Sequence, residues 1–533
     1  MSLPKEEAVK ALSINSDEAD LARLGYRQEF LREFGSLATL SFAFSIMGVA
    51  ATIPATFDTP MLVAGPAAVI WAWFIGSLFC MSIALSIAEI ISAYPISGGL
   101  YTASKFVVPK SQIPLVSWTV GWLNTLGQIA GFASTDFACA RMVAAVGTLV
   151  SDGTYAATPG VLVGIYIAIL VLHGAINTAS TKAMAVMTKY FVFINFGTAI
   201  AIIIALFATV PESQKLSAHD VLFSYNDATG WNSDGLAMLF GLLSVCWTMT
   251  DYDATGHIAE ETHRAAIRGP VSIIAAVAGT GILGLILNIA FVACSNNITL
   301  PGATGMSTVE ILLNNVGKNG TIVLLVLIIL VTNTIGISAL QANSRMVFAM
   351  GRDGGLPFSG FWSKIHPRLQ VPVNAVWIII FISALMGLLN LASATAVNAI
   401  FSLATVAMDW SYAITIIYKI YYCHIKKTIQ FTPGPFTMGP TLGFIVNVIA
   451  VVWTAFVSCI LVLPNYLPLT VDTMNYSGPI AGAVMLLSMI WFYADAHNWY
   501  KGPLGNIEHP GEFVGGAEVE VQQQKREEFV ASA

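Results

Sequence analysis

Charged residues are scarce in this sequence. Lys and Arg number 24 and Asp and Glu number 30, so charged side chains make up 10% of the 533 residues, whereas soluble domains carry about 25%. Hydrophobic residues reach 56%, and the mean hydropathy is +0.73. This composition excludes a water-soluble domain and a disordered chain, because neither hides so much apolar surface. Continuous apolar runs of about 18 or more residues also favour membrane helices over a β-barrel, whose strands alternate.

Motifs for metal, phosphate or covalent chemistry are also missing. The cysteines are Cys80, Cys139, Cys246, Cys294, Cys423 and Cys459. They are scattered through apolar runs without a CxxC pair, which indicates small buried hydrophobic residues rather than a metal or disulfide site. His257 is followed by Glu260 and Glu261 and not by a second histidine, so no zinc pair is present. The sequence predicts no enzyme, no catalytic residue, no metal, no cofactor and no nucleic-acid partner.

Apolar runs of membrane length recur along the chain and predict an all-α polytopic membrane protein with about twelve transmembrane helices. The expected spans cover residues 36–57, 63–92, 115–147, 160–177, 184–210, 236–259, 270–294, 321–345, 373–391, 397–420, 440–464 and 479–499. Before them, residues 1–34 form an expected cytoplasmic tail. Residues 35–500 form the transmembrane domain, and residues 501–533 form an acidic cytoplasmic tail. An amphipathic segment on the membrane surface is expected in the first tail, from Leu21, Leu24, Phe30, Leu31 and Phe34.

Basic residues concentrate in alternate loops, which predicts the orientation in the membrane. They precede span 1 and follow each even-numbered span, whereas the other loops hold only Lys215 and Lys318. The positive-inside rule therefore places both tails in the cytoplasm. Sequons begin at Asn297, Asn319 and Asn475, all in loops expected outside. The plasma membrane is the expected location, with the vacuole or another internal membrane left open.

Two of the spans break the rules for a membrane helix. In span 1, Gly48 lies at mid-membrane between Ser45 and Pro54, and in span 6 Asp251 and Asp253 interrupt an apolar run. Interrupted helices at corresponding positions of two halves are typical of inverted-repeat transporters. The freed N–H and C=O groups can bind a carboxylate, an ammonium group or an ion. Close packing of two helices at Gly48 is the alternative.

Other polar residues lie at membrane depth: Asn124, Gln128, Asp136, Asn333 and Asp409. The acids are functional candidates, whereas hydrogen bonding between helices explains the amides more simply. Arg141, near the outer end of span 3, either pairs with Asp136 about one turn away or reaches the interface.

Motifs in a fixed order extend from about residue 20 to 505. They are Leu24-Gly25-Tyr26, Ala88-Glu89, Tyr94-Pro95-Ile96-Ser97-Gly98-Gly99-Leu100-Tyr101, Trp118, Gly121-Trp122, Tyr252-Asp253-Ala254, Ser344-Arg345, Arg352-Asp353-Gly354-Gly355, Val371-Pro372, Asp409-Trp410-Ser411-Tyr412 and Met474-Asn475-Tyr476. Together they resemble the amino acid–polyamine–organocation superfamily, and within it the fungal GABA permease and choline transporter family.

The resemblance implies a LeuT-like fold, with a 5+5 inverted repeat plus two extra helices. It also implies import of a small amino-group solute, usually driven by protons. In this fold the substrate binds at the two helix breaks. Carried over, the implied residues are Ser45, Ile46, Met47, Gly48, Val49, Thr248, Thr250, Asp251 and Tyr252. Tyr252 takes the place of a gating aromatic, whereas Asp251 replaces a residue that is small in many relatives and favours an ammonium or quaternary ammonium group.

The leading hypothesis is a proton-coupled permease for GABA or a related amino acid. The candidate proton acceptors are Asp251, Asp253, Asp136 and Asp409, and the candidate gate or loop-pairing acids are Glu89, Glu260 and Glu261. A choline or polyamine transporter of the same fold is the alternative, in which Asp251, Trp247 and Tyr252 form a cation site. A non-transporting nutrient receptor is an alternative of another class. The expected partners are the substrate, H+ and the lipid bilayer.

Overall fold

The structure is a computed structural model that describes residues 17–296, 298–391, 394–471, 473–503 and 505. Within this part of the chain, twelve helical segments are long and apolar enough to cross a membrane, and each overlaps one expected span. The prediction of an all-α polytopic membrane protein with twelve spans is therefore confirmed. Extended pairing in the described residues is limited to an isolated bridge between Phe34 and Thr262.

Ten spans contain one long helix each. These helices are α5 (Pro66–Ala93), α7 (Ile113–Val150), α8 (Pro159–Asn177), α10 (Phe191–Thr209), α15 (Ala265–Ala293), α17 (Lys318–Arg352), α19 (Val373–Gly387), α20 (Ala394–Tyr418), α21 (Pro440–Leu461) and α22 (Ser477–Ala494). Local sequence starts several of them. At α8, Pro159 takes the first helical position and the side chain of Thr158 accepts a hydrogen bond from the Val161 N–H, so the helix begins with a satisfied cap.

The other two spans are interrupted. Span 1 consists of α2 (Ser36–Met47), α3 (Val49–Thr56) and α4 (Asp58–Ala64), and span 6 of α12 (Asp234–Phe240), α13 (Leu242–Met249) and α14 (Ala254–His257). The expected breaks at Gly48 and at Asp251–Asp253 are therefore present. The relation of the two halves by an inverted repeat stays a prediction.

Shorter helical segments connect the spans or extend them at an end. They are α6 (Gly99–Ala103), α9 (Thr181–Thr188), α11 (Ala218–Phe223), α16 (Ser307–Val316), α18 (Ser359–Trp362), the 3₁₀ turns η1 (Ser104–Phe106), η2 (Lys110–Gln112), η3 (Glu212–Gln214), η4 (Ala259–Glu261), η5 (Leu388–Leu391) and η7 (Ala496–Asn498), and the π-helical turn η6 (Lys419–Ile425).

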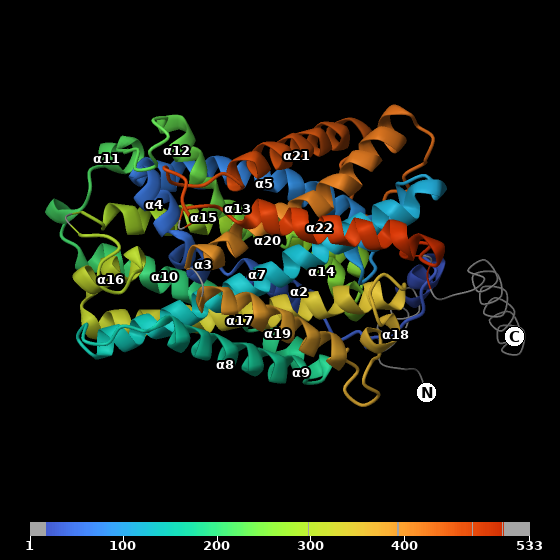
Figure 1. Ribbon diagram of the computed structural model, residues 1–533, viewed down its shortest axis with the longest axis horizontal. Helices are drawn as coiled ribbons and strands as arrows, with labels where there is room; N and C mark the ends of the chain where they lie inside the picture. The colour runs from blue at the N-terminus through green and yellow to red at the C-terminus, as the bar shows by residue number, and fades with distance from the viewer. Residues whose placement is uncertain (1–16, 297, 392–393, 472, 504, 506–533) are drawn as a thin grey trace, which may run out of the picture.

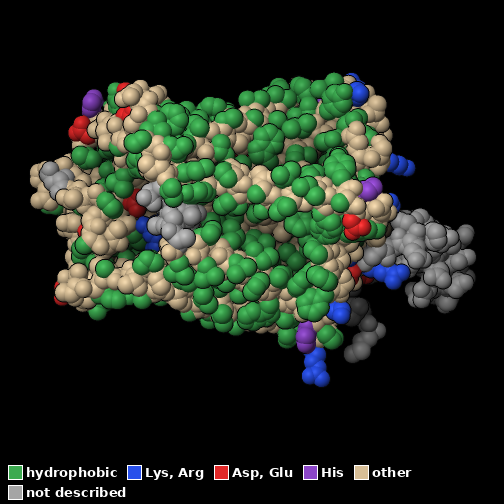
Figure 2. Space-filling view, in the orientation of Figure 1, with side chains coloured by type: hydrophobic (Ala, Val, Ile, Leu, Met, Phe, Trp, Pro, Cys, Tyr) green, Lys and Arg blue, Asp and Glu red, His purple; other side chains and the backbone are tan. Residues whose placement is uncertain are grey.

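The spans run side by side along the longest axis of the molecule, and the described chain ends lie at one end of it (Figure 1). We call this end the chain-end face; α4, α11, α12 and α16 lie at the opposite face. Hydrophobic side chains cover the visible flank, and Lys and Arg gather at the chain-end face (Figure 2). Burial differs between spans: 83% of the most apolar stretch of span 1 is buried, but only 17% of that of span 12. The interrupted span 1 is thus central, where a site can be enclosed.

The segment before span 1 packs on the protein. Leu21, Phe30 and Phe34 are buried, whereas Leu31 is 52% exposed. Arg32 donates hydrogen bonds to the carbonyl oxygens of Ala259 and Thr262, the turn that follows span 6. This segment therefore contacts the helix bundle, and its place on the membrane surface stays a prediction.

Several smaller expectations have mixed outcomes. Cys80, Cys139, Cys246 and Cys294 are buried as expected, but Cys459 is exposed.

Among the sequons, Asn297 lies outside the described residues, and Asn319 lies in the first turn of α17. The Asn475 amide donates hydrogen bonds to the carbonyl oxygens of Leu461 and Leu463. Most of the expected tail 501–533 also lies outside the described residues.

Candidate functional site

The break in span 1 depends on a glycine. Gly48 has φ +36° and ψ +50°, and it ends α2 and begins α3. A Cβ atom at this position would lie 2.2 Å from Ile335 Cδ1 of α17. Only glycine combines the left-handed backbone with this close approach.

The backbone groups freed at this break find partners in the protein. The Ala50 N–H donates to Asn195 Oδ1 over 3.1 Å, and Asn195 Nδ2 donates to the Phe44 carbonyl over 3.3 Å. Thr52 Oγ1 donates to the Met47 carbonyl over 3.0 Å. Asn195, on α10, thus bridges the two halves of span 1. In the sequence, Asn195 is a lone amide in an apolar run, a signal too weak to predict this role.

The break in span 6 is centred on Asp251. Helix α13 ends at Met249, and Asp251 has φ +66°, a left-handed conformation that costs a non-glycine residue about 1–3 kcal/mol. Backbone hydrogen bonding resumes where the Ala254 N–H donates to the Asp251 carbonyl over 3.1 Å.

A small cavity lies between the two breaks. Its volume is about 30 Å³, and it is lined by Ile46, Thr52, Gln128, Gly131, Phe132, Thr135, Trp247, Thr250, Asp251, Ile335, Ala339 and Met408. Of the predicted substrate residues, Ile46, Trp247, Thr250 and Asp251 line this central cavity. The others do not, namely Ser45, Met47, Gly48, Val49, Thr248 and Tyr252. A space of this size holds about two water molecules, so its walls must separate before an amino acid can enter.

Asp251 is the charged side chain that lines the central cavity. Its Oδ1 atom is buried and has no hydrogen-bond partner among the described residues. A buried carboxylate without a partner is costly unless it takes up a proton or pairs with a cation. The geometry therefore provides a place for an ammonium group or a proton.

Asp253, two residues further, is fully engaged. Its Oδ1 accepts a hydrogen bond from the Tyr412 hydroxyl over 2.7 Å, and its Oδ2 lies 2.9 Å from Asn124 Nδ2 and 3.1 Å from His257 Nε2. Gln128 Nε2 lies 2.6 Å from the same His257 nitrogen, while His257 Nδ1 lies 2.9 Å from the Ser97 carbonyl. With Nδ1–H donating to Ser97, His257 Nε2 has a partner in either state: Asp253 when protonated, and the Gln128 amide when not.

The remaining predicted proton acceptors lie outside the cavity lining. Asp136 Oδ2 contacts His173 Nδ1 at 3.0 Å, and His173 Nε2 contacts Asn333 Oδ1 at 3.0 Å, so this acid is paired between α7, α8 and α17. Asp409, on α20, is buried, and its Oδ1 has no partner among the described residues.

Arg141 does not pair with Asp136. Its Nη2 atom lies 4.0 Å from Asp58 Oδ2 and donates to the Gly305 carbonyl over 3.0 Å. Five residues of an α-helix turn by about 140° beyond one full turn, so Arg141 and Asp136 point to different sides of α7. The first of the two sequence interpretations of Arg141 is therefore wrong.

An aromatic pair lies at the wall of the central cavity, which Trp247 lines. The rings of Trp247 and Phe401 lie 4.8 Å apart, and Trp247 Nε1 donates to Ser134 Oγ over 3.0 Å. Tyr252, the expected gating aromatic, instead packs against Tyr412 with ring centres 6.0 Å apart. We call Trp247 and Phe401 the aromatic barrier.

The three candidate gate acids all form buried ion pairs near the chain-end face. Glu89 pairs with Lys419 at 2.5 Å, Glu260 with Arg352 at 3.4 Å, and Glu261 with Arg345 at 2.5 Å. The first pair joins α5 to η6, and the other two join η4 to α17. On this side, ion pairs therefore connect the helices.

Asp353, just beyond α17, belongs to a cluster at the same face. Burial raises the pKa of Asp353 to about 6, although Arg352 and Lys105 oppose the shift. The Tyr26 hydroxyl lies 3.4 Å from Asp353 Oδ2. Because the pKa in the folded state exceeds the ordinary value, the folded protein favours the neutral carboxyl. The stability that the neutral Asp353 carboxyl provides is present below about pH 4 and is lost as the pH rises through 6.

The Asp353→Asn variant tests this contribution. We expect its melting temperature to exceed that of the parent protein by on the order of 1–3 °C at pH 7.5, with a smaller difference at pH 5. Thermal unfolding of purified protein at both pH values measures it. Asp152→Asn, whose side chain is 79% exposed, is the control. A lower melting temperature of Asp353→Asn at both pH values contradicts the prediction.

Comparison with known proteins adds evidence from the whole chain. Residues 34–486 match the model of the amino acid permease family. An uncharacterised amino-acid permease of Schizosaccharomyces pombe is 39% identical, over 93% of this chain and 91% of its own length. Amino-acid permease 2 of Neurospora crassa is 34% identical, over 92% and 90%. The GABA-specific permease of Saccharomyces cerevisiae is 29% identical, over 97% and 91%.

Proposed function

The chain belongs to the amino acid permease family, and from this premise we propose that it imports GABA or a related amino acid together with protons, by alternating access. Members of this family are transporters and not enzymes, and the twelve spans make the chain an integral membrane protein. The observation that carries the proposal is the Asp251 side chain, which lines the central cavity and whose Oδ1 atom has no hydrogen-bond partner among the described residues. It suits the ammonium group of an amino acid.

The proposed proton route starts at the same acid. Gln128 lines the central cavity and also reaches His257, which contacts Asp253. His257 has a hydrogen-bond partner whether or not its Nε2 carries a proton, as a group that takes up and releases protons requires. Gln128, His257 and Asp253 thus form a hydrogen-bonded chain that begins at the cavity lined by Asp251.

The proposed orientation places the chain-end face in the cytoplasm of a cell whose plasma membrane holds the protein. Lys and Arg gather at that face (Figure 2), as the positive-inside rule requires of cytoplasmic loops. The three buried ion pairs of Glu89, Glu260 and Glu261 then close the inner side. The aromatic barrier lies between the central cavity, which Trp247 lines, and the cavity that Phe401 lines.

Uptake into proteoliposomes tests the proposal. Purified protein is reconstituted and given a pH gradient, acidic outside, with labelled GABA, other amino acids, choline and polyamines as separate substrates. We expect at least one amino acid to accumulate above its outside concentration, and accumulation to stop when the gradient is collapsed. Accumulation that is indifferent to the gradient contradicts proton coupling. Binding without flux of any solute supports a receptor instead.

An organic cation is the second candidate substrate, because Asp251 lies with Trp247 in one cavity wall. A carboxylate beside an aromatic ring binds quaternary ammonium groups through charge and cation–π attraction. A competition experiment distinguishes the two candidates. If choline is transported and inhibits GABA uptake at the same concentration, the organic cation is supported. If choline does not inhibit GABA uptake, the amino acid is supported.

A further inference from the structure

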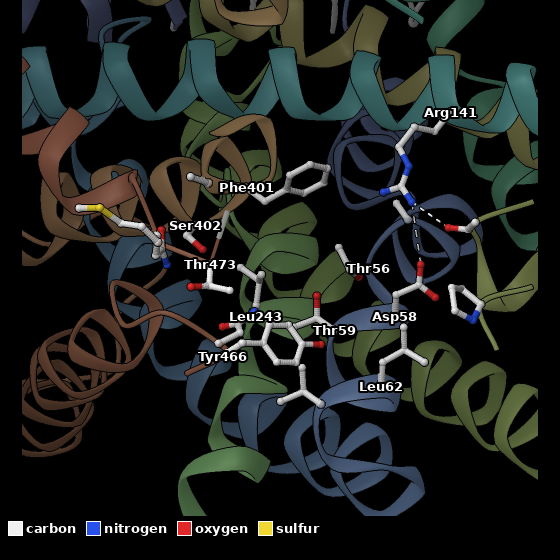
Figure 3. Close-up of a pocket in the computed structure, with 18 residues that line it drawn as sticks. Thr56, Asp58, Thr59, Leu62, Arg141, Leu243, Phe401, Ser402, Tyr466 and Thr473 are labelled. Carbon is white, nitrogen blue, oxygen red and sulfur yellow. Dashed lines mark hydrogen bonds and ion pairs between the residues drawn. The ribbon is translucent and has the colours of Figure 1, made fainter. Parts of the chain in front are cut away.

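A second cavity is lined by residues of α4 and of the loop before α16 (Figure 3), and both helices lie at the face opposite the chain ends (Figure 1). Its volume is about 360 Å³, which is large enough for an amino acid, unlike the central cavity. Phe401 lines this cavity and contacts Trp247, which lines the central one. The two cavities are therefore neighbours on either side of the aromatic barrier. We call the larger one the vestibule.

Two opposite charges lie together in the wall of the vestibule. Arg141 of α7 and Asp58 of α4 are the charged side chains among its described lining residues, and their side chains are 30% and 24% exposed. The closest atoms, Arg141 Nη2 and Asp58 Oδ2, are 4.0 Å apart. A closed guanidinium–carboxylate pair has parallel contacts of about 2.8 Å. This pair is open, so each partner retains bonding capacity for a ligand.

Each charge is held in place by the backbone of one loop. Asp58 Oδ1 accepts a hydrogen bond of 2.9 Å from the Ser307 N–H at the start of α16, and Arg141 Nη2 donates to the Gly305 carbonyl over 3.0 Å. A guanidinium group has five N–H donors, and Arg141 uses one of them in the contacts between described residues. The hydroxyls of Thr59, Ser402 and Tyr466 line the remaining wall (Figure 3).

We propose that the vestibule is a first binding site for a zwitterionic amino acid, whose carboxylate binds Arg141 and whose ammonium group binds Asp58. The substrate then passes the aromatic barrier to reach Asp251. This inference rests on the proposed function and narrows its substrate class. Arg141 supplies the carboxylate partner that the central cavity lacks, and it repels a solute that carries positive charge only.

Kinetics of the Arg141→Gln variant give the first test. We expect the KM for GABA in proteoliposomes to rise about tenfold or more, because charge-assisted hydrogen bonds to the carboxylate are lost. Arg141→Lys is expected to recover part of the affinity, since it keeps the charge but not the fork-shaped set of donors. Lys318→Gln removes an exposed cation that pairs with Asp152 and is the matched control. An unchanged KM in Arg141→Gln overturns the proposal.

A binding measurement makes the test independent of transport. Ser402→Cys, in a background with Cys423→Ser and Cys459→Ser, places a thiol in the vestibule for a membrane-impermeant reagent. We expect GABA or L-alanine to slow its labelling, and choline to have no effect. The protection is expected to persist when Asp251→Asn is added and to disappear when Arg141→Gln is added. Equal protection in the presence of Arg141→Gln, or protection by choline, contradicts the proposal.

The two measurements separate the two claims. If amino acids are taken up but Arg141→Gln leaves KM unchanged and no solute protects the thiol at position 402, the vestibule site is refuted and the proposed function is retained. If amino acids protect this thiol but are not taken up, the proposed function is refuted and the zwitterion site is retained.

Discussion

Replacing Asp251 by asparagine is expected to lower kcat/KM for uptake about a hundredfold or more. The change keeps the size of the side chain and removes its charge at the wall of the central cavity. Loss of one partner of a buried, hydrogen-bonded charge pair costs about 2–5 kcal/mol, and a hundredfold change corresponds to about 2.7 kcal/mol. Initial rates of labelled GABA uptake in proteoliposomes, across a range of concentrations and outside pH values, measure the effect.

Two further variants show whether Asp251 acts on the substrate, the proton or both. Asp152→Asn removes an exposed charge and should leave uptake unchanged. Asp253→Asn removes the acid that contacts His257 and is expected to abolish uphill accumulation while exchange of internal for external substrate continues. If uptake, affinity and pH dependence all survive in Asp251→Asn, that residue has neither role.

The positions of the spans and their breaks follow from local signals, and for this reason the sequence predicted them. A continuous apolar run marks each span without reference to any other part of the chain. The break in span 1 is marked by Gly48, and that in span 6 by acids in an apolar run. The structure adds the reason for the glycine, because Ile335 of α17 leaves no space for a Cβ atom.

The partners of the buried polar groups do not follow from local signals. Asp253 accepts a hydrogen bond from the hydroxyl of Tyr412, which lies 159 positions away in the sequence, and Glu89 pairs with a lysine 330 positions away. Hydropathy assigns such residues to a depth in the membrane but not to a neighbour. The interpretation that Arg141 pairs with Asp136 failed for this reason, since its anionic neighbour is Asp58 at the end of span 1. Which acids have a side-chain oxygen without a partner among the described residues was equally beyond the sequence.

The buried pair of Glu261 and Arg345 is the contact whose loss should cost most in stability. Glu261 is 0% and Arg345 1% exposed at the side chain, and their closest atoms are 2.5 Å apart. Gln341 donates a further hydrogen bond to Glu261 over 3.3 Å. The Glu261 carbonyl also accepts the N–H groups of Glu33 and Phe34, each at 2.9 Å. The pair therefore holds span 8, the turn after span 6 and the segment before span 1 in one arrangement.

Arg345→Met is expected to lower the free energy of unfolding by about 3–5 kcal/mol, because it leaves the Glu261 carboxylate buried without its cation. The double variant with Glu261→Gln should regain a large part of this loss, since no uncompensated charge then remains. Thermal unfolding of the purified proteins compares the single and double variants. Glu212→Gln, which breaks an exposed pair with Lys215, should change stability by less than about 0.5 kcal/mol. The loss of unfolding free energy in the double variant is then compared with the sum of the losses in the two single variants. If the two values are equal, the side chains act separately, and packing rather than the ion pair holds this end of the bundle.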